Sequence, residues 1–212
     1  MNSSLKTNKL ETQTDNLGHE TENGSVWLKR RSFKIALLSI FTALAVVFGY
    51  MLVNIPNIEL FTLIIFLSGF IMGKKEGMLV GLLSATIFCL FNLYGASPLP
   101  LLAYQLMHYS LTGLAGALTR NYLDKKSYFK PKEDLYVFRV IVLFGFIGGL
   151  ITFIYDLLST FFGAILFSQS INYFLTTYIS GIVFTSIHLI GNILGFIFIL
   201  PGLIQIIMKL LN

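Results

Sequence analysis

The sequence predicts an all-α membrane protein with six transmembrane helices, and three observations lead to this fold class. Hydrophobic residues make up 55% of the 212 residues, and the mean hydropathy is +0.77. They gather in long apolar runs separated by short polar connections. Basic residues occupy only every second connection. A soluble domain would lack the polar surface for this composition, whereas helices in lipid satisfy their own backbone groups.

The first three apolar runs each end at polar or turn-forming residues. The first, about 32–53, precedes a connection that contains Pro56. The second, about 58–73, is short for a span, which needs about 20 residues, and it stops at a pair of lysines. The third, about 77–94, ends before Gly95. These boundaries predict three consecutive antiparallel helices.

The last three predicted spans lie on either side of a basic loop. The fourth covers about 98–119, the loop covers 120–137, and the fifth covers about 138–163. The last region, about 174–209, is too long for one upright span, so we expect its start to form an outer loop or cap. Pro201 is expected to kink its inner end.

Lysine and arginine predict the topology. They precede the first run, follow the second, separate the fourth from the fifth and close the sixth: Lys29, Arg30, Arg31, Lys34, Lys74, Lys75, Arg120, Lys125, Lys126, Lys130, Lys132, Arg139 and Lys209. The connections near 54–57, 95–98 and 164–174 have none. Cytoplasmic loops retain basic residues, so both termini are predicted to be cytoplasmic in the plasma membrane.

The remaining composition defines the domain organisation. Residues 1–28 form a polar segment without the apolar core of a signal peptide, and we expect a disordered cytoplasmic tail. Residues 29–212 are one predicted six-helix domain. The net charge of +5 reflects basic residues at span ends, where anionic lipid attracts them, and does not indicate nucleic-acid binding. The single cysteine, Cys89, excludes an intrachain disulfide.

Ionisable side chains at membrane depth are costly, so each marks a candidate site. Glu59 opens the second span at its outer end, and Asp156 lies in the outer half of the fifth. His108 and His188 lie near the middle of the fourth and sixth. Further polar groups gather at similar depths: Asn54, Asn57, Asn92, Tyr94, Tyr104, Gln105, Tyr155, Tyr173, Tyr178 and Asn192.

The spacing of these groups predicts a pocket open to the outside. Tyr104 and His108 are four residues apart, as are His188 and Asn192, so each pair shares a helix face. Plainer roles stay open: interfacial tyrosines, histidines that only pack or join helices, and Glu59 as a helix cap. Because the outer half carries two carboxylates and no Lys or Arg, a neutral or cationic ligand, or one with a small carboxylate held by histidine, is predicted.

Sequence motifs for catalysis are missing. There is no His-Glu-x-x-His helix, no Gly-x-Ser-x-Gly turn and no Walker A sequence. We therefore predict no enzyme activity, no cofactor and no metal site. The first span carries Ser32, Ala36, Ser39 and Ala43 on one face, which indicates either packing inside the bundle or a smooth docking face for another membrane protein.

Several segments together resemble the substrate-binding (S) components of energy-coupling factor (ECF) transporters. They are Asn57-Ile-Glu-Leu, Ser68-Gly-Phe-Ile-Met-Gly, Gly77-Met-Leu-Val-Gly, Phe91-Asn-Leu-Tyr-Gly, Pro98-Leu-Pro with the following Gln105, Tyr155-Asp-Leu-Leu-Ser and His188-Leu-Ile-Gly-Asn. The resemblance covers about residues 32–210. It implies a six-helix protein that captures a vitamin or related micronutrient and delivers it inward when docked on a transmembrane coupling protein and two ATPase subunits.

The resemblance also implies roles for individual residues. Ala36, Ser39 and Ala43 would contact the coupling protein, although Ser39 departs from the family's alanine-rich pattern. The substrate-binding residues would be Asn57, Glu59, Asn92, Tyr94, Gln105, Tyr155, Asp156, His188 and Asn192, and His108 joins them from its depth in the fourth span. Two other functions stay open: a membrane scaffold of the cell-wall machinery, and a small intramembrane enzyme using His108, Asp156 and His188.

Overall fold

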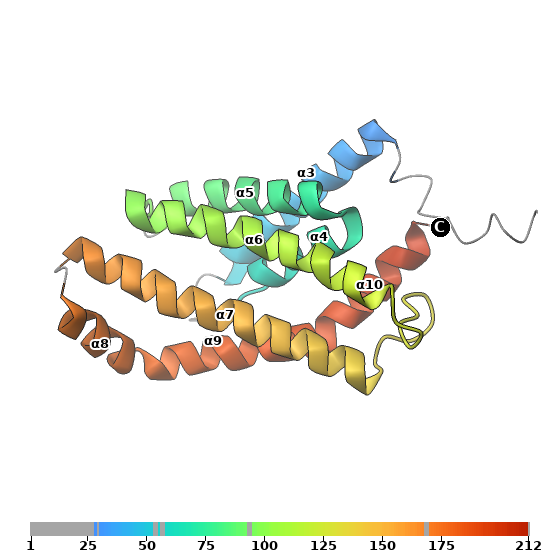
Figure 1. The fold of residues 1–212 in the computed structure, drawn as a ribbon. Coiled ribbons are helices and arrows are strands. Elements are labelled where there is room, and N and C mark those ends of the chain that lie inside the picture. The colour runs from blue at the N-terminus through green and yellow to red at the C-terminus, as the bar shows by residue number, and fades with distance from the viewer. Residues whose placement is uncertain are drawn as a thin grey trace, which may run out of the picture.

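The computed structural model describes residues 28, 30–52, 55, 58–92, 95–167 and 170–211, and within them the protein is helical with no strands. Each predicted apolar run forms helix, so the all-α fold class is confirmed. The described helices, shown in Figure 1, are α3 (Arg31–Leu52), α4 (Phe61–Met72), α5 (Lys74–Leu90), α6 (Leu99–Leu123), α7 (Phe138–Phe167), α8 (Ile171–Ser180), α9 (Ile182–Leu194) and α10 (Leu200–Leu210). The predicted tail, apart from Leu28, and several loop residues, among them Asn54, Asn57 and Tyr94, lie outside this description.

Three helical segments are long and apolar enough to cross a membrane: Arg31–Leu52, Phe138–Ala164 and Ile182–Leu210. Their outward faces carry exposed apolar side chains, such as Val47 on α3 and Phe146 on α7. Continuous exposed apolar surface of this kind is compatible with lipid rather than water as the solvent.

Helix α4 lies at the centre of the bundle and is too short to cross it. Its 12 residues span about 18 Å, against about 30 Å for a hydrocarbon core, and all of them are buried. It packs against α3, α5, α6 and α10. The second run was predicted to be short for a span, and α4 is shorter still; Glu59 precedes it by two residues, as predicted for the start of this segment.

Glycines set the distance between α4, α5 and α6. A Cβ placed on Gly69 would lie 1.7 Å from the Gly113 carbonyl oxygen, and one on Gly113 would lie 2.0 Å from the Gly77 carbonyl oxygen. Gly116 meets the backbone of Phe66 in the same way. The three backbones touch directly, so these positions accept no side chain, and the helices form one closely packed unit.

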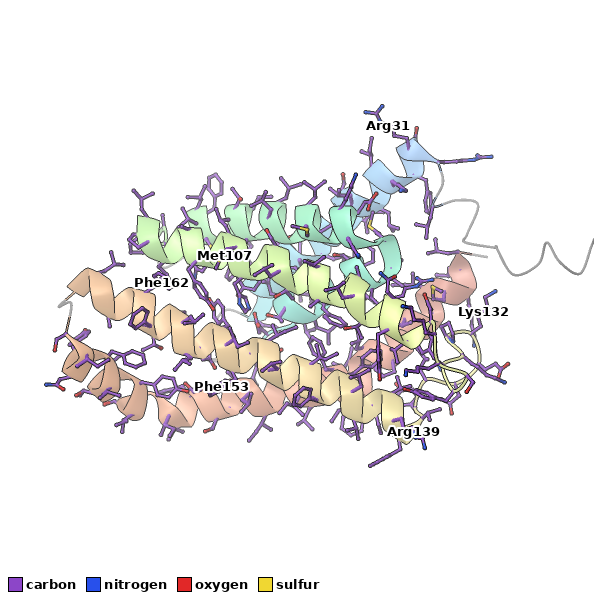
Figure 2. The ribbon with its side chains drawn as sticks, in the orientation of Figure 1. Arg31, Met107, Lys132, Arg139, Phe153 and Phe162 are labelled. Carbon is purple, nitrogen blue, oxygen red and sulfur yellow. The ribbon has the colours of Figure 1, made fainter. Side chains whose placement is uncertain are left out.

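Arg120 connects the ends of three helices. Its guanidinium donates a hydrogen bond of 3.2 Å to the carbonyl oxygen of Phe70, near the end of α4, and contacts the Met208 sulfur of α10. The carbonyl at the end of a helix lacks an intrahelical donor, and this side chain supplies one. Figure 2 shows Arg31, Lys132 and Arg139 at this same end of the bundle.

The start of the last apolar region forms a separate element, as predicted, but that element is a helix, and the irregularity near the inner end lies before Pro201. Helix α8 is separate and has no buried residue, and α9 starts after Gly181. A π-helical turn at Gly195–Ile199 joins α9 to α10, one turn before the kink expected at Pro201. Because Pro201 has no N–H and its ring displaces the carbonyl four residues earlier, the irregularity forms in the preceding turn. Figure 1 shows α10 turning away from α9 there.

Replacing Gly113 with alanine should lower the stability of the purified protein by about 3 kcal/mol, because the added methyl group meets the backbone of α5. Thermal unfolding in detergent measures this effect. Gly163→Ala is the matched control, since a Cβ there meets no described atom within 4 Å and alanine favours helix. Equal loss of stability in both variants would contradict the proposed packing.

Candidate functional site

Three ionisable side chains from distant parts of the chain meet inside the bundle. His188 of α9 lies with its Nδ1 atom 2.8 Å from Asp156 Oδ1 and its Nε2 atom 3.2 Å from Glu59 Oε1. Only 8% of the His188 side chain is exposed, against 13% for Asp156 and 21% for Glu59. We call these three residues the polar cluster.

Two neutral side chains hold Glu59 in place. Asn192, one turn after His188 on α9, donates a hydrogen bond of 3.3 Å to Glu59 Oε1, and the Thr62 hydroxyl of α4 donates to the same oxygen. Glu59 lies two residues before α4, which is buried along its whole length. It does not act as the N-cap predicted as one alternative, because Leu60 precedes α4 and no side chain caps that helix.

The contacts of His188 determine how many protons the polar cluster holds. A neutral imidazole carries one N–H, so hydrogen bonds at both ring nitrogens require one more proton. That proton lies either on the imidazole, between two carboxylates, or on one of the carboxyl groups. An imidazolium between two carboxylates has a net charge of minus one. A neutral imidazole with one carboxylate and one carboxylic acid has the same net charge. No Lys or Arg among the described residues is paired with it.

Aromatic residues of α6 and α7 form a second layer beside the polar cluster. The Tyr155 ring lies 6.2 Å from that of His188 and 5.1 Å from that of His108, measured between centroids. Gln105 Nε2 donates to the Tyr155 hydroxyl at 3.2 Å, and the Tyr104 hydroxyl lies 3.3 Å from His108 Nδ1. The predicted pairing of Tyr104 with His108 on one helix face is therefore confirmed.

Three buried polar atoms of this region have no hydrogen-bond partner among the described residues: Asp156 Oδ2, His108 Nε2 and Gln105 Oε1. Buried polar atoms are almost always paired, because each unpaired atom costs about 1–3 kcal/mol. Water or a ligand would satisfy them. The region therefore has hydrogen-bonding capacity beyond its internal contacts.

A cavity of about 170 Å³ opens beside the polar cluster. Its walls combine the carboxylate and imidazole with aromatic and aliphatic side chains: Gly49, Leu52, Ile55, Ile58, Glu59, Phe88, Tyr109, Tyr155 and His188. Drug-sized pockets are usually 300–1,000 Å³, so this cavity suits a small molecule or one part of a larger one. Aromatic faces next to an excess of negative charge favour a cation.

The structure brings together most of the predicted site residues, namely Glu59, Gln105, His108, Tyr155, Asp156, His188 and Asn192. Their role in binding stays a prediction. Of these residues, Glu59, Tyr155 and His188 line the cavity, whereas Gln105, His108, Asp156 and Asn192 do not. Asn92 does not line it either; it follows α5, and its backbone carbonyl accepts a hydrogen bond from the Gly95 N–H. Asn57 and Tyr94 lie outside the described residues.

Sequence reasoning missed several residues of this region, among them Thr62 and most residues of the cavity wall. Thr62 follows Glu59 by three positions, a spacing at which side chains at a helix start can bond, and this signal was available. Tyr109 and Phe88 line the cavity from α6 and α5 without a distinguishing sequence signal. No group of three or more His, Cys, Asp or Glu side chains in the described part of the chain is arranged to hold a metal ion.

Comparisons of the chain with protein-family models, with curated proteins and with solved structures found no match.

Replacing His188 with leucine should destabilise the protein by about 3–5 kcal/mol, because two buried carboxylates then face each other without a cation. Adding Asp156→Asn to His188→Leu should recover part of this loss, since one of the opposed charges is removed. Thermal unfolding of both variants and of Asp156→Asn alone measures the coupling. Additive effects of the two substitutions would show that the carboxylates do not interact through His188.

Proposed function

We propose that this protein is the substrate-capture subunit of an ECF-type importer in the plasma membrane. Six membrane spans with both termini in the cytoplasm follow from the positions of the basic residues. The subunit binds a vitamin or related small organic micronutrient in the cavity beside the polar cluster. It delivers this ligand inward when docked on a coupling protein and two ATPase subunits.

The observation that carries this proposal is the net negative charge of the polar cluster next to a cavity. A charge in the low-dielectric interior of an apolar bundle is costly unless it is paired, and here one negative charge lacks a cationic partner among the described residues. A cationic ligand in the cavity would supply that partner. Glu59 is the carboxylate of the polar cluster that lines the cavity, so it is the acceptor that such a ligand would meet.

The cavity walls narrow the chemical class of the ligand. Phe88, Tyr109 and Tyr155 present aromatic surface beside Glu59. Such a wall favours a flat heterocycle or an alkylammonium group, through stacking or cation–π contact. A multiply anionic compound would be repelled. We therefore assign a small cationic or neutral organic molecule, in line with the charge prediction from the sequence.

Helix α3 offers the surface proposed for docking on the coupling protein. Ala36, Ser39 and Ala43 are exposed and share one face of α3. The Ser39 hydroxyl bonds to the Ile35 carbonyl of its own helix, so it presents no unpaired polar group outward. Small residues allow another membrane helix to approach closely.

The two other functions find less support in the contacts. An intramembrane enzyme with His188 as general base would need a free ring nitrogen, but both nitrogens contact carboxylates. A scaffold without a ligand would satisfy its buried polar groups internally, whereas Asp156, His108 and Gln105 each retain an unpaired atom among the described residues. We therefore propose a binding protein rather than an enzyme or a scaffold.

Purified protein, extracted with solvent and analysed by mass spectrometry, should release a small cationic or neutral compound. Glu59→Gln, which alters the carboxylate that lines the cavity, should weaken the affinity for that compound about 10- to 100-fold, the value of a hydrogen bond to a charged group. Equilibrium binding measures the effect. Glu133→Gln, which removes an exposed carboxylate in the 124–137 loop, is the matched control and should bind normally. Preferential binding of a multiply anionic compound would refute the proposed ligand class.

Ala36→Trp should reduce recovery of coupling protein and ATPase subunits with this protein by about tenfold or more, because the large side chain separates the helices. Quantitative co-purification from membranes measures the effect. Ala103→Trp, an exposed alanine on α6, is the matched control and should retain the complex. Ligand binding by both variants should be unchanged. Loss of ligand binding in Ala36→Trp would show a folding defect instead of lost docking.

A further inference from the structure

A second hollow lies at the basic end of the bundle, away from the polar cluster. It is an open groove of about 430 Å³ formed by the end of α6, the following loop and the start of α7. Its lining residues are Tyr122, Tyr128, Phe138, Arg139, Val142, Leu143 and Phe146. Figure 2 shows Arg139 at the start of α7, at the same end as Lys132.

One side of this groove is an apolar stripe on α7. Phe138, Val142 and Phe146 follow each other at four-residue spacing, so they lie along one face of the helix. Their side chains are 75%, 49% and 67% exposed. An exposed stripe two turns long is suited to an acyl chain that lies along the helix.

Two cations lie against tyrosines of this groove: Arg139, which itself lines it, and Lys126, which contacts the lining residue Tyr122. The Arg139 guanidinium lies 5.6 Å from the centroid of the Tyr128 ring, and Lys126 Nζ lies 4.8 Å from that of Tyr122. Neither cation forms an ion pair with a carboxylate of the described residues. Lys34, Arg120 and Lys130, in contrast, each have an acidic partner. The tyrosine rings orient the two cations without neutralising them.

We propose that this groove is a binding site for an anionic phospholipid. The acyl chain packs along Phe138, Val142 and Phe146, and the headgroup phosphate pairs with Arg139 and Lys126. Arginine favours phosphate because its planar donors contact two oxygens at once. Basic groups next to apolar helix faces at a membrane surface are the usual recognition elements for anionic lipid.

The groove combines an apolar stripe with two cations, and this combination favours one class of ligand. A free phosphate ion would use only the two cations and leave the stripe exposed. A zwitterionic lipid would cover the stripe but bring no net charge to Arg139. An anionic phospholipid satisfies both parts of the groove. The site is independent of the ligand cavity beside the polar cluster, since no lining residue is shared.

Native mass spectrometry of the whole protein in an equimolar mixture of phosphatidylglycerol and phosphatidylcholine tests this site. The unmodified protein should retain phosphatidylglycerol preferentially. Arg139→Gln should weaken that retention about five- to tenfold. Lys75→Gln is the matched control, because it removes an exposed cation at the start of α5, outside the groove. Equal loss in both variants would reveal diffuse surface attraction and overturn the proposal.

Two further measurements separate the remaining outcomes. Phe146→Ala should also weaken retention, whereas Phe153→Ala, an exposed phenylalanine farther along α7, should not. Millimolar inorganic phosphate should leave the bound lipid in place. Displacement of the lipid by phosphate, or indifference to Phe146→Ala, would show that the stripe does not take part. Thermal unfolding of each variant verifies that the fold is intact.

Discussion

Direct backbone contact between α4, α5 and α6 is the constraint on which the rest of the structure depends. Glycines at Gly69, Gly77 and Gly113 remove the side chains that would hold the three helices apart. Helix α4 can therefore lie in the centre of the bundle, where it is enclosed on every side. Because α4 is buried along its whole length, Glu59 just before it lies within reach of His188. The position of the polar cluster is thus a consequence of helix packing far from it.

Charge is distributed unevenly along the bundle, and this distribution links the two proposed sites. Lysine and arginine gather at the end where α6 and α10 finish, while Glu59 and Asp156 lie inside with a net negative charge. Electrostatic attraction is stronger where water is excluded, so each region selects ligands of opposite sign. Under the two proposals, one protein would bind a cation at its centre and an anionic headgroup at its rim without competition between them.

The sequence predicted helix for each apolar run that forms α3 to α7, α9 and α10, because long hydrophobic stretches indicate a lipid or core environment directly, but it did not predict α8 as a separate helix. It also predicted the pair of Tyr104 with His108, since four-residue spacing alone places them together. The contact of His188 with Glu59 joins positions 129 residues apart, and no local pattern encodes such a distance. The complete burial of α4 could not be predicted either, because an apolar run has the same sequence pattern whether protein or lipid surrounds it.

The π-helical turn at Gly195–Ile199 explains how one row of side chains stays buried along both α9 and α10. His188, Asn192, Phe196, Leu200 and Ile204 are all buried, at a strict interval of four. In a regular α-helix this interval drifts by about 40° per step, so the ends of such a row would face different directions. The wider turn takes up about one residue of rotation, roughly 100°. If this turn were regular α-helix and Leu200 and Ile204 kept their buried positions, His188 would rotate away from both carboxylates.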